Sequence, residues 1–317
     1  MTENRWFRRD ASGCLHVSSR GKLNLFLEVL GRRDDGFHEL ETVMVRCSLA
    51  DTLTFRRRSD DQIRLTLTEG SVNADSFPLD DSNLIVKAAK SLQQEAALNL
   101  GADIRVHKRI PSEAGLAGGS SNAAFTLLAL RELWNASLTD DDLHQLAAEL
   151  GSDINFFVAN CRAARCTGRG ETVQPLAWNR RLYAVLARPA RGNSTPEIFR
   201  RLQPPNEPRS SAPLLAAAGA RSKTSIVAGD ELHAMTPATA AQLSENVFNR
   251  LTEVARQINP AMSDLLDRLE RTCGVPAHMT GSGSTCFVLT PSHRQARIWH
   301  RKIRSTNNAP FTALVEL

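Results

Sequence analysis

The sequence predicts an α+β protein of two domains, and three observations support this prediction. The chain has 317 residues, of which 42% are hydrophobic and 23% charged, as is typical of a globular protein with a buried core. Segments with apolar residues at alternate positions and segments with helical spacing follow one another without a strict βαβ alternation. At roughly 150 residues per domain, the length favours two domains, which we place at residues 1–175 and 176–317.

Strands dominate the first part of the chain. Residues 14–30 alternate apolar and polar side chains and predict two strands, with a break at Arg20 and Gly21. The segment GRRDDGFHEL, residues 31–40, is rich in turn-forming residues and predicts a loop. Further strands are marked by the apolar residues Val43, Val45, Leu53, Phe55, Ile63, Leu65 and Leu67.

Helices and strands then mix. Residues 80–99 begin with an acidic cap and carry apolar residues at helical spacing, and Gly101 ends this helix. The alternating segment 102–111 predicts a strand that stops at Pro111. The later elements are helices over 121–134, 138–150, 246–258, 262–272 and 291–304, strands within 161–176 and 180–189, two strands around a glycine loop in 274–291, and a last strand over 311–317.

Two local signals refine this outline. Thr139 and Asp142 form a pair like a capping box at the start of the helix over 138–150, and Gly151 is a natural stop for that helix. Residues 203–242 are rich in Pro, Ala and Ser with weak periodicity. We expect a long surface loop or partly disordered insertion there.

The amino-acid composition bears on the kinds of binding partner that the protein can have. The net charge of +5 comes largely from scattered arginines and suits an anionic small molecule or a nucleic acid, without favouring either. Aromatic residues make up only 5% of the chain, with a single tyrosine, which is poor for stacking on bases. The six cysteines include no CxxC or zinc-ligand spacing, so we expect reduced thiols. No apolar run is long enough for a membrane span, and the N-terminus has no secretory signal. We therefore expect a cytoplasmic protein without a membrane or nucleic-acid partner, either a monomer or a homodimer.

The stretch PSEAGLAGGSSNAA, residues 111–124, carries the strongest chemical signal. Glycine lets a ligand approach the backbone closely, and free N–H groups at the start of a helix attract anions. Ser120 and Ser121 add hydroxyls for phosphate oxygens or Mg²⁺. A phosphate-binding loop and a plain packed turn fit this composition equally well, and neither GxxxxGK[ST] nor GxGxxG is present.

Three other stretches carry candidate site residues, each with a structural alternative. Lys22 and Asn24 share one face of a predicted strand, where the commoner role is that of an exposed edge residue. Asp153 follows a helix stop and could simply cap the next helix. Gly281 and Gly283 lie between two predicted strands and could form only a tight hairpin.

Together these stretches resemble the three motifs of the GHMP small-molecule kinases. The motifs are GKLNLFLEV at 21–29, the glycine stretch at 111–124 and MTGSGSTCF at 279–287, in that order. The resemblance runs from about Ser18 to Phe199 and returns at 245–290. It implies an N-terminal domain like ribosomal protein S5, a ferredoxin-like C-terminal domain, and ATP with Mg²⁺ as cofactors.

The segments GRRDDGFHELETV, LGSDINFFV and TGRGE narrow the resemblance to family members whose acceptor alcohol carries a cytidine diphosphate. It implies that Lys22 and Asp153 are catalytic, with Lys22 favouring the ionised form of Asp153. The implied ATP-binding residues are Asn83, Pro111, Gly115, Leu116, Gly118, Gly119, Ser120 and Ser121, with Ser120 or Ser121 also contacting Mg²⁺. The implied substrate-binding residues are Asn24, Phe37, His38, Thr195, Phe199, Gly281 and Gly283.

The sequence departs from the family pattern at a few positions. The second motif usually reads GLGGGSSDAA, whereas this chain has Ala117 and Asn122, which leaves the mode of Mg²⁺ binding open. Phe37 replaces a usual tyrosine, and Asn155 replaces a usual proline. Two other functions remain as alternatives: a GHMP kinase for mevalonate, homoserine or a sugar, and a non-catalytic RNA-binding protein with the S5-like fold.

Overall fold

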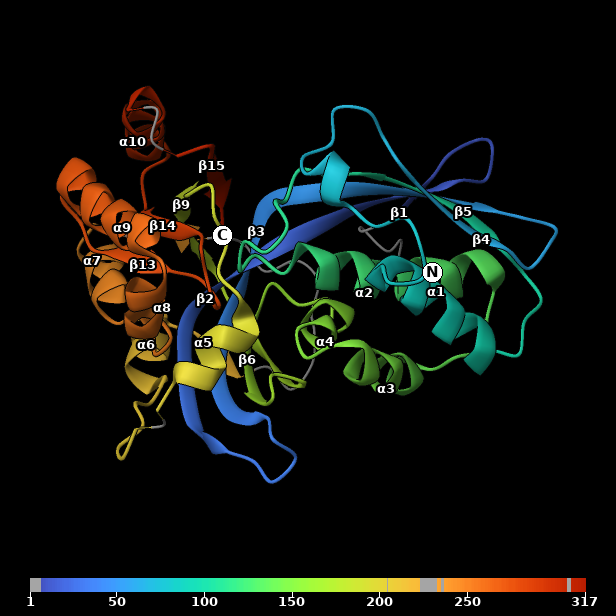
Figure 1. The fold of residues 1–317 in the computed structure, drawn as a ribbon, viewed down its shortest axis with the longest axis horizontal. Coiled ribbons are helices and arrows are strands. Elements are labelled where there is room, and N and C mark those ends of the chain that lie inside the picture. The colour runs from blue at the N-terminus through green and yellow to red at the C-terminus, as the bar shows by residue number, and fades with distance from the viewer. Residues whose placement is uncertain (1–6, 204, 223–232, 235–236, 307–308) are drawn as a thin grey trace. The chain divides into compact units, whose positions relative to one another are not determined.

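The computed structural model describes residues 7–203, 205–222, 233–234, 237–306 and 309–317 (Figure 1). Helices and strands are mixed along the chain, so the predicted α+β class is confirmed. The chain forms two compact units, and neither is one continuous segment. The first unit contains the described residues up to Gly21 together with 49–112 and 117–160; the second contains 22–48, 113–116 and the described residues from Cys161 on.

The first unit combines a sheet with a layer of helices. Strand β1 (Phe7–Arg9) pairs antiparallel with the start of β2 (Leu15–Arg32). The end of β3 (His38–Arg57) pairs antiparallel with β5 (Ala102–His107), which in turn pairs parallel with β4 (Ile63–Leu67). The helical segments are the 3₁₀ turn η1 (Ala74–Ser76) and helices α1 (Leu84–Glu95), α2 (Gly118–Trp134), α3 (Asp140–Leu150) and α4 (Ile154–Val158).

Helix α2 is the central helix of this unit. Every residue from Ser121 to Leu130 is buried, and the helix packs against α1 and α4 (Figure 1). A helix that is apolar on all sides is a core helix rather than a surface one. Helix α3 begins with the predicted capping box of Thr139 and Asp142, and Gly151 caps its end, as expected.

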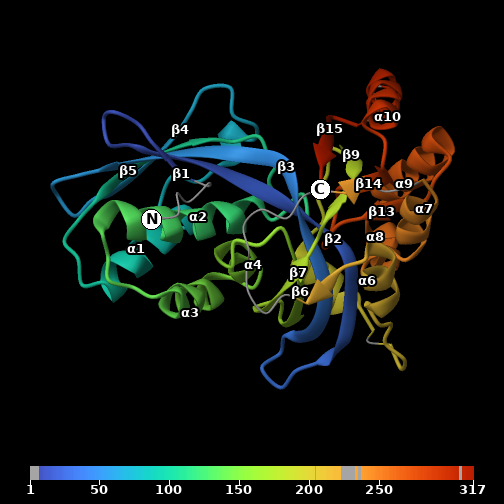
Figure 2. The same ribbon diagram turned by 180° about the vertical axis from the view of Figure 1, so that it is seen from behind.

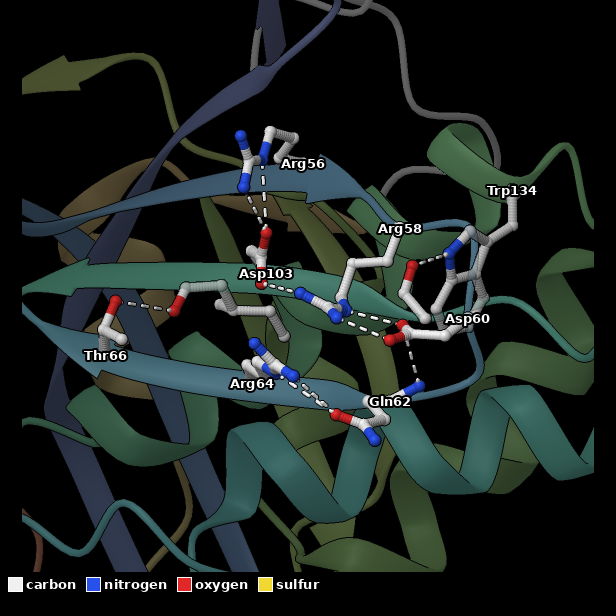
Figure 3. Close-up of polar contacts among 10 residues, drawn as sticks. Arg56, Arg58, Asp60, Gln62, Arg64, Thr66, Asp103 and Trp134 are labelled. Carbon is white, nitrogen blue, oxygen red and sulfur yellow. Dashed lines mark hydrogen bonds and ion pairs between the residues drawn. The ribbon is translucent and has the colours of Figure 1, made fainter.

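An arginine–carboxylate network ties the strands of the first unit together (Figure 3). Arg58 binds Asp60 through two nitrogens, at 2.6 and 2.5 Å, and reaches Asp103 at 2.8 Å. Arg56 donates to the other oxygen of Asp103 at 2.6 Å. Nearby, Trp134 at the end of α2 donates to the carbonyl of Gly101 at 3.2 Å and fixes the helix against the start of β5.

The second unit contains a four-stranded antiparallel sheet in the order β13–β14–β9–β15. These strands are Ala277–Met279, Cys286–Thr290, Tyr183–Arg188 and Phe311–Glu316. Helices α9 (Pro260–Cys273) and α10 (His293–Ser305) pack on this sheet (Figure 2). Their apolar faces form one core with Leu27 and Val29 of β2.

The rest of the second unit surrounds the remaining parts of β2 and β3. Strand β6 (Ala163–Gly168) pairs with residues 40–45 of β3, and β7 (Thr172–Ala177) pairs with β6. The short elements are β8 (Arg180–Arg181), α5 (Thr195–Arg201), α6 (Ala212–Ala218), β10 (Arg221–Ser222), β11 (His233–Ala234), α7 (Pro237–Glu245), β12 (Phe248–Asn249) and α8 (Thr252–Ile258). Strand β12 pairs parallel with residues 26–27 of β2.

Three sequence predictions need correction. The break expected at Arg20 and Gly21 is absent, because Gly21 does not take a positive φ and β2 continues through it. The helix expected over 246–258 begins only at Thr252, because the amide of Asn249 donates to the carbonyls of Met279 and Gly281 and holds this stretch extended. The loop expected over 203–242 contains α6 and the start of α7, while residues 204, 223–232 and 235–236 of it lie outside the described residues.

The division into two domains at residues 1–175 and 176–317, predicted from the sequence, stays a prediction. None of the six cysteines forms a disulfide, in agreement with the reduced thiols expected from their spacing. Within the described residues, no helix has both the length and the apolar character that crossing a membrane requires.

Candidate active site

The glycine stretch forms a tight turn that leads directly into α2. Gly115 has a φ of 73°, and Ala117 is the N-cap of α2 with a φ of 54°. The first intrahelical hydrogen bond runs from the N–H of Ser121 to the carbonyl of Ala117, at 2.9 Å. The N–H groups of Gly118, Gly119 and Ser120 therefore precede the hydrogen-bonded part of the helix and have no intrahelical acceptor.

This helix start is open on one side and packed on the other. Gly119 is exposed, and a Cβ there would meet only Leu84, at 3.7 Å. A Cβ on Gly118 would lie 2.8 Å from Ile110 and 3.3 Å from the Lys108 ammonium. Free N–H groups, the helix dipole and an accessible backbone make this turn suitable for an anion such as a phosphate.

The two serines of the turn differ in availability. The hydroxyl of Ser121 is fully buried, donates to the carbonyl of Arg20 at 2.7 Å and lies 2.7 Å from the hydroxyl of Ser19. Ser120 is only half-buried. Of the two predicted contacts for phosphate or Mg²⁺, Ser120 is therefore the one whose hydroxyl is available.

Asp153 lies at the start of α4 but does not cap it. Its side chain makes no capping hydrogen bond, so the structural alternative raised from the sequence does not apply. The side chain is half-buried, whereas Ile154, Phe156 and Phe157 of α4 are fully buried and fix the helix. Asn155, in place of the usual proline, accepts a hydrogen bond from His144 of α3 if that ring carries its proton on Nδ1, at 2.8 Å.

In the second unit, Lys22 and Asn24 lie on one face of β2, as predicted. The Lys22 ammonium donates to the Asn24 side-chain oxygen at 2.6 Å, and both residues are buried. The Asn24 amide nitrogen donates to the hydroxyl of Thr42 at 2.8 Å, and its backbone N–H donates to the hydroxyl of Thr280 at 2.9 Å. Neither residue is therefore the exposed edge residue that was the alternative.

The glycines of the third motif pack against this group. A Cβ on Gly281 would lie 3.1 Å from the carbonyl oxygen of Gly115 and 3.5 Å from the Asn24 side-chain oxygen. A Cβ on Gly115 would lie 2.2 Å from the carbonyl oxygen of Thr280, which excludes any other residue there. The structure thus brings together Lys22, Asn24, Gly115 and Gly281, three segments that are far apart in sequence.

Gly283 serves a different purpose. A Cβ there would lie 2.5 Å from the amide nitrogen of Asn193 and 2.8 Å from the sulfur of Met279. Asn193 donates to the carbonyl of Ser282 at 2.8 Å, and Thr195 meets the Ser282 hydroxyl at 2.6 Å. The loop between β13 and β14 is therefore fastened to the start of α5, which carries the predicted residues Thr195 and Phe199.

Three of the predicted substrate-binding residues, Phe37, His38 and Phe199, carry aromatic rings. The rings of His38 and Phe199 are in contact, with centroids 5.1 Å apart and planes inclined by 33°. Burial lowers the pKa of His38, with a further contribution from Arg32, so the imidazole is held in its neutral form. Phe37 is 54% exposed, and the Arg169 guanidinium lies 5.0 Å from its ring centre.

The remaining residues predicted to bind ATP also make contacts within the protein. Asn83 caps α1: its side-chain oxygen accepts from the N–H of Ile85 at 2.9 Å, and its nitrogen donates to the carbonyl of Pro78 at 2.5 Å. Leu116 is buried and its carbonyl accepts from the N–H of Lys22 at 3.1 Å. Pro111 is buried at the entry to the turn. Lys22 and Asp153 belong to different units, so their proximity stays a prediction.

Comparison with known proteins identifies the family. The model of the GHMP kinases N terminal domain matches residues 83–160, and the model of the GHMP kinases C terminal domain matches residues 231–309. A protein of Rhodopirellula baltica named 4-diphosphocytidyl-2-C-methyl-D-erythritol kinase is 36% identical over 96% of this chain and 93% of its own length. The chain belongs to the GHMP kinase family.

Two further matches agree with this membership. A protein of the same name from Azoarcus sp. is 40% identical over 87% of this chain and 85% of its own length. A solved structure of 4-(cytidine 5'-diphospho)-2C-methyl-D-erythritol kinase superposes with a TM-score of 0.70 and 29% identity, covering 95% of this chain and 98% of the other. The chain thus has the GHMP kinase fold with its N- and C-terminal domains, as the resemblance implied.

Membership also clarifies the cofactor. A GHMP kinase uses ATP as its phosphoryl donor. Among the described residues, no three His, Cys, Asp or Glu side chains form a metal-binding group. Mg²⁺ in phosphoryl-transfer enzymes is commonly held by one or two protein groups together with the substrate phosphates. The open turn with Ser120 fits a metal bound in that way.

Sequence reasoning missed several residues of these clusters. Thr280 and Thr42 orient Asn24, and Asn193 fastens the loop around Gly283. Thr280 stands beside Gly281 in the third motif and could have been found there. Thr42 lies in the segment GRRDDGFHELETV and could likewise have been found there, whereas Asn193 lies in a stretch with no such signal.

Proposed function

We propose that this kinase transfers the γ-phosphoryl group of ATP to the 2-hydroxyl of 4-diphosphocytidyl-2-C-methyl-D-erythritol, a step in non-mevalonate isoprenoid biosynthesis. The observation that carries the proposal is the contact between His38 and Phe199 in the unit that also holds Lys22 and Asn24. An aromatic pair can stack on an acceptor that carries a nucleobase. Mevalonate and homoserine have no ring on which such a pair could stack. The names of the relatives support the same acceptor.

The aromatic pair must adjust to admit the base. With ring centroids 5.1 Å apart, His38 and Phe199 already contact each other and leave no room for a ring between them. We propose that the cytosine moves the half-buried Phe199 side chain aside and stacks against it. The neutral His38 imidazole then offers one donor and one acceptor nitrogen to the edge of the base.

In the proposed mechanism the protein aligns the reactants and neutralises charge. The N–H groups of Gly118, Gly119 and Ser120 bind the ATP phosphates, and Ser120 helps to hold Mg²⁺. Asp153 orients the 2-hydroxyl and accepts its proton as the oxygen attacks the γ-phosphorus. The bond from that phosphorus to the bridging oxygen breaks, and its electrons stay on ADP. Lys22 supplies positive charge for the transfer, and Asn24 binds the methylerythritol end of the acceptor.

The location, oligomeric state and partners of the enzyme are also proposals. We propose a cytoplasmic monomer or homodimer with a small-molecule substrate and without a nucleic-acid or membrane partner. The absence of a membrane-spanning helix among the described residues is compatible with this.

The proposal is tested by ADP release with purified protein, ATP and Mg²⁺. The acceptors are 4-diphosphocytidyl-2-C-methyl-D-erythritol, mevalonate, homoserine and galactose, each assayed separately. We expect turnover with the cytidylyl compound alone. Turnover with one of the others instead would replace the proposed acceptor and leave the aromatic pair without its assigned role.

The role of Asp153 gives a first mutational prediction. Asp153→Asn should lower kcat by at least about 100-fold, the usual range for loss of a group that receives a proton. The melting temperature of the variant is measured alongside, so that a loss of the fold can be told apart from a loss of chemistry. Asp140→Asn, which removes an exposed carboxylate paired with Arg131, is the control and should keep full activity. Wild-type turnover by the Asp153 variant would contradict the mechanism.

A further inference from the structure

A buried carboxylate lies beneath the glycine turn, in the first unit. Asp51, in β3, has no exposed surface and accepts hydrogen bonds from four donors. One oxygen accepts the backbone N–H groups of Arg109 at 2.7 Å and Ile110 at 2.9 Å. The other accepts the Asn122 side-chain amide at 3.0 Å and pairs closely with the Lys108 ammonium.

These donors lie on both sides of the turn. Arg109 and Ile110 come immediately before Pro111, where the chain enters the turn, and Asn122 lies in the first turns of α2, where the chain leaves it. One carboxylate therefore holds the entry and the exit of the turn together. Four donors on two oxygens leave Asp51 little freedom to move.

The packing above this group is equally close. Gly118 packs closely against Ile110 and the Lys108 ammonium, since a Cβ added to it would lie only 2.8 and 3.3 Å from them. Any shift of Lys108 or Ile110 would therefore be passed to the first residue of α2. The backbone N–H groups proposed to bind phosphate belong to that residue and the next two.

The charges of the group are balanced. An uncompensated carboxylate so close to the start of α2 would repel a phosphate, and its burial would be costly. Lys108, itself 3% exposed, supplies the opposite charge. Asn122 adds a neutral donor, which an ionised aspartate at that position could not do, and so the carboxylate keeps one counter-charge and all four donors.

We propose that Asp51 is a positioning residue for ATP: through Lys108, the 109–110 backbone and Asn122, it fixes the N–H groups of the phosphate-binding turn. It does not touch the nucleotide. The inference rests on the proposed function of the turn as the ATP phosphate site. It is specific to the donor, so the binding of the acceptor alcohol should not depend on Asp51.

The test compares Asp51→Asn with the wild type in two assays. The first is calorimetric binding of Mg²⁺ and a non-hydrolysable ATP analogue, and the second is steady-state kinetics with both substrates. A displacement of about 1 Å in a positioned group can cost up to about 100-fold. We expect analogue affinity to fall, and KM for ATP to rise, by about tenfold or more, while KM for the acceptor changes less than about twofold.

A matched control separates positioning from general destabilisation. Glu28→Gln alters another fully buried, ion-paired carboxylate, which lies in the second unit and binds Arg250. All assays are run below the melting transitions of the variants. The control should lose stability and keep its affinity for the analogue. An equal loss of affinity in both variants would overturn the proposal.

A second variant covers the case in which Asp51→Asn does not fold. Asn122→Ala removes only the hydrogen bond between Asp51 and α2 and leaves the Asp51–Lys108 ion pair in place. It should still weaken analogue binding by several-fold, and unchanged binding by a folded Asn122→Ala would overturn the proposal. If the wild type binds the analogue but turns over no acceptor, only the proposed substrate fails. If the wild type does not bind the analogue, both proposals fall.

Discussion

Ala117 shows how a single residue sets the strain in the phosphate-binding turn. It has a φ of 54°, in the left-handed region, at a position where the family motif usually has glycine. An L-residue pays about 1–2 kcal/mol for this conformation, whereas glycine does not. The departure noted from the sequence is thus a local cost in stability rather than a change in chemistry.

This gives a prediction for Ala117→Gly. Relief of strain should outweigh the greater flexibility of glycine, which costs about 0.5–1 kcal/mol, so the free energy of unfolding should rise by up to about 1 kcal/mol. Urea denaturation measures the change. Ala123→Gly, a helical position in the same helix, is the control and should destabilise the protein. A lower stability for Ala117→Gly than for the wild type would contradict the strain.

At the scale of elements, the segment before α6 is held by two buried carboxylates. Glu28 of β2 accepts the N–H of Arg209 at 2.9 Å and binds Arg250 at 2.7 and 2.6 Å. Glu41 of β3 accepts from Ser211 and from Arg165. These side-chain anchors fasten a Pro- and Ala-rich stretch that has little periodicity of its own.

Glu28→Gln should therefore be costly. Gln keeps the shape but leaves the partly buried Arg250 guanidinium without its counter-charge, and breaking such a pair costs about 3 kcal/mol. Thermal and urea unfolding measure the decrease in the free energy of unfolding. Glu197→Gln removes an exposed pair with Arg201 and should cost no more than about 0.5 kcal/mol. Equal effects of the two substitutions would show that burial of Glu28 does not strengthen its pair.

These elements also show what the sequence could predict. The capping box at Thr139, the strand faces of Lys22 and Asn24, and the turn before α2 follow from periodicity and local chemistry, and the structure agrees. Helix α6 was missed although Pro213 near its start and Gly219 at its end are ordinary helix signals. The extended stretch before α8 and the hydrogen bonds of Asp51 could not be predicted, because they depend on partners tens of residues away in the sequence.

At the scale of the whole molecule, titration should make the protein sensitive to acid. Hydrogen bonds from arginines lower the pKa of Asp60 to about 2 and, against the effect of burial, also lower that of Glu28. Burial lowers the pKa of His278 to about 4. Each group then binds fewer protons when folded than when unfolded, so stability falls as pH falls. For His278 the loss begins below its unfolded pKa of about 6.5 and ends near the folded value; for the carboxylates it begins below about 4.

The contribution of His278 to the pH dependence of stability can be measured separately. The free energy of unfolding of the wild type should decrease between pH 6.5 and about 4, and His278→Gln should reduce that slope because glutamine does not titrate. Glutamine can also keep the hydrogen bond to Ser244. An unchanged slope in His278→Gln would assign the acid sensitivity to other groups.

The interleaved composition of the two units has a consequence for biosynthesis. The first unit is complete once residue 160 has been made, but residues 22–48 belong to the second unit and pair with β6 and β12, which are translated later. At about 5–20 residues per second, this segment waits on the order of ten seconds on the ribosome before β6, its next strand partner, has been made. A nascent chain is then prone to aggregate, and chaperone demand should concentrate in that interval.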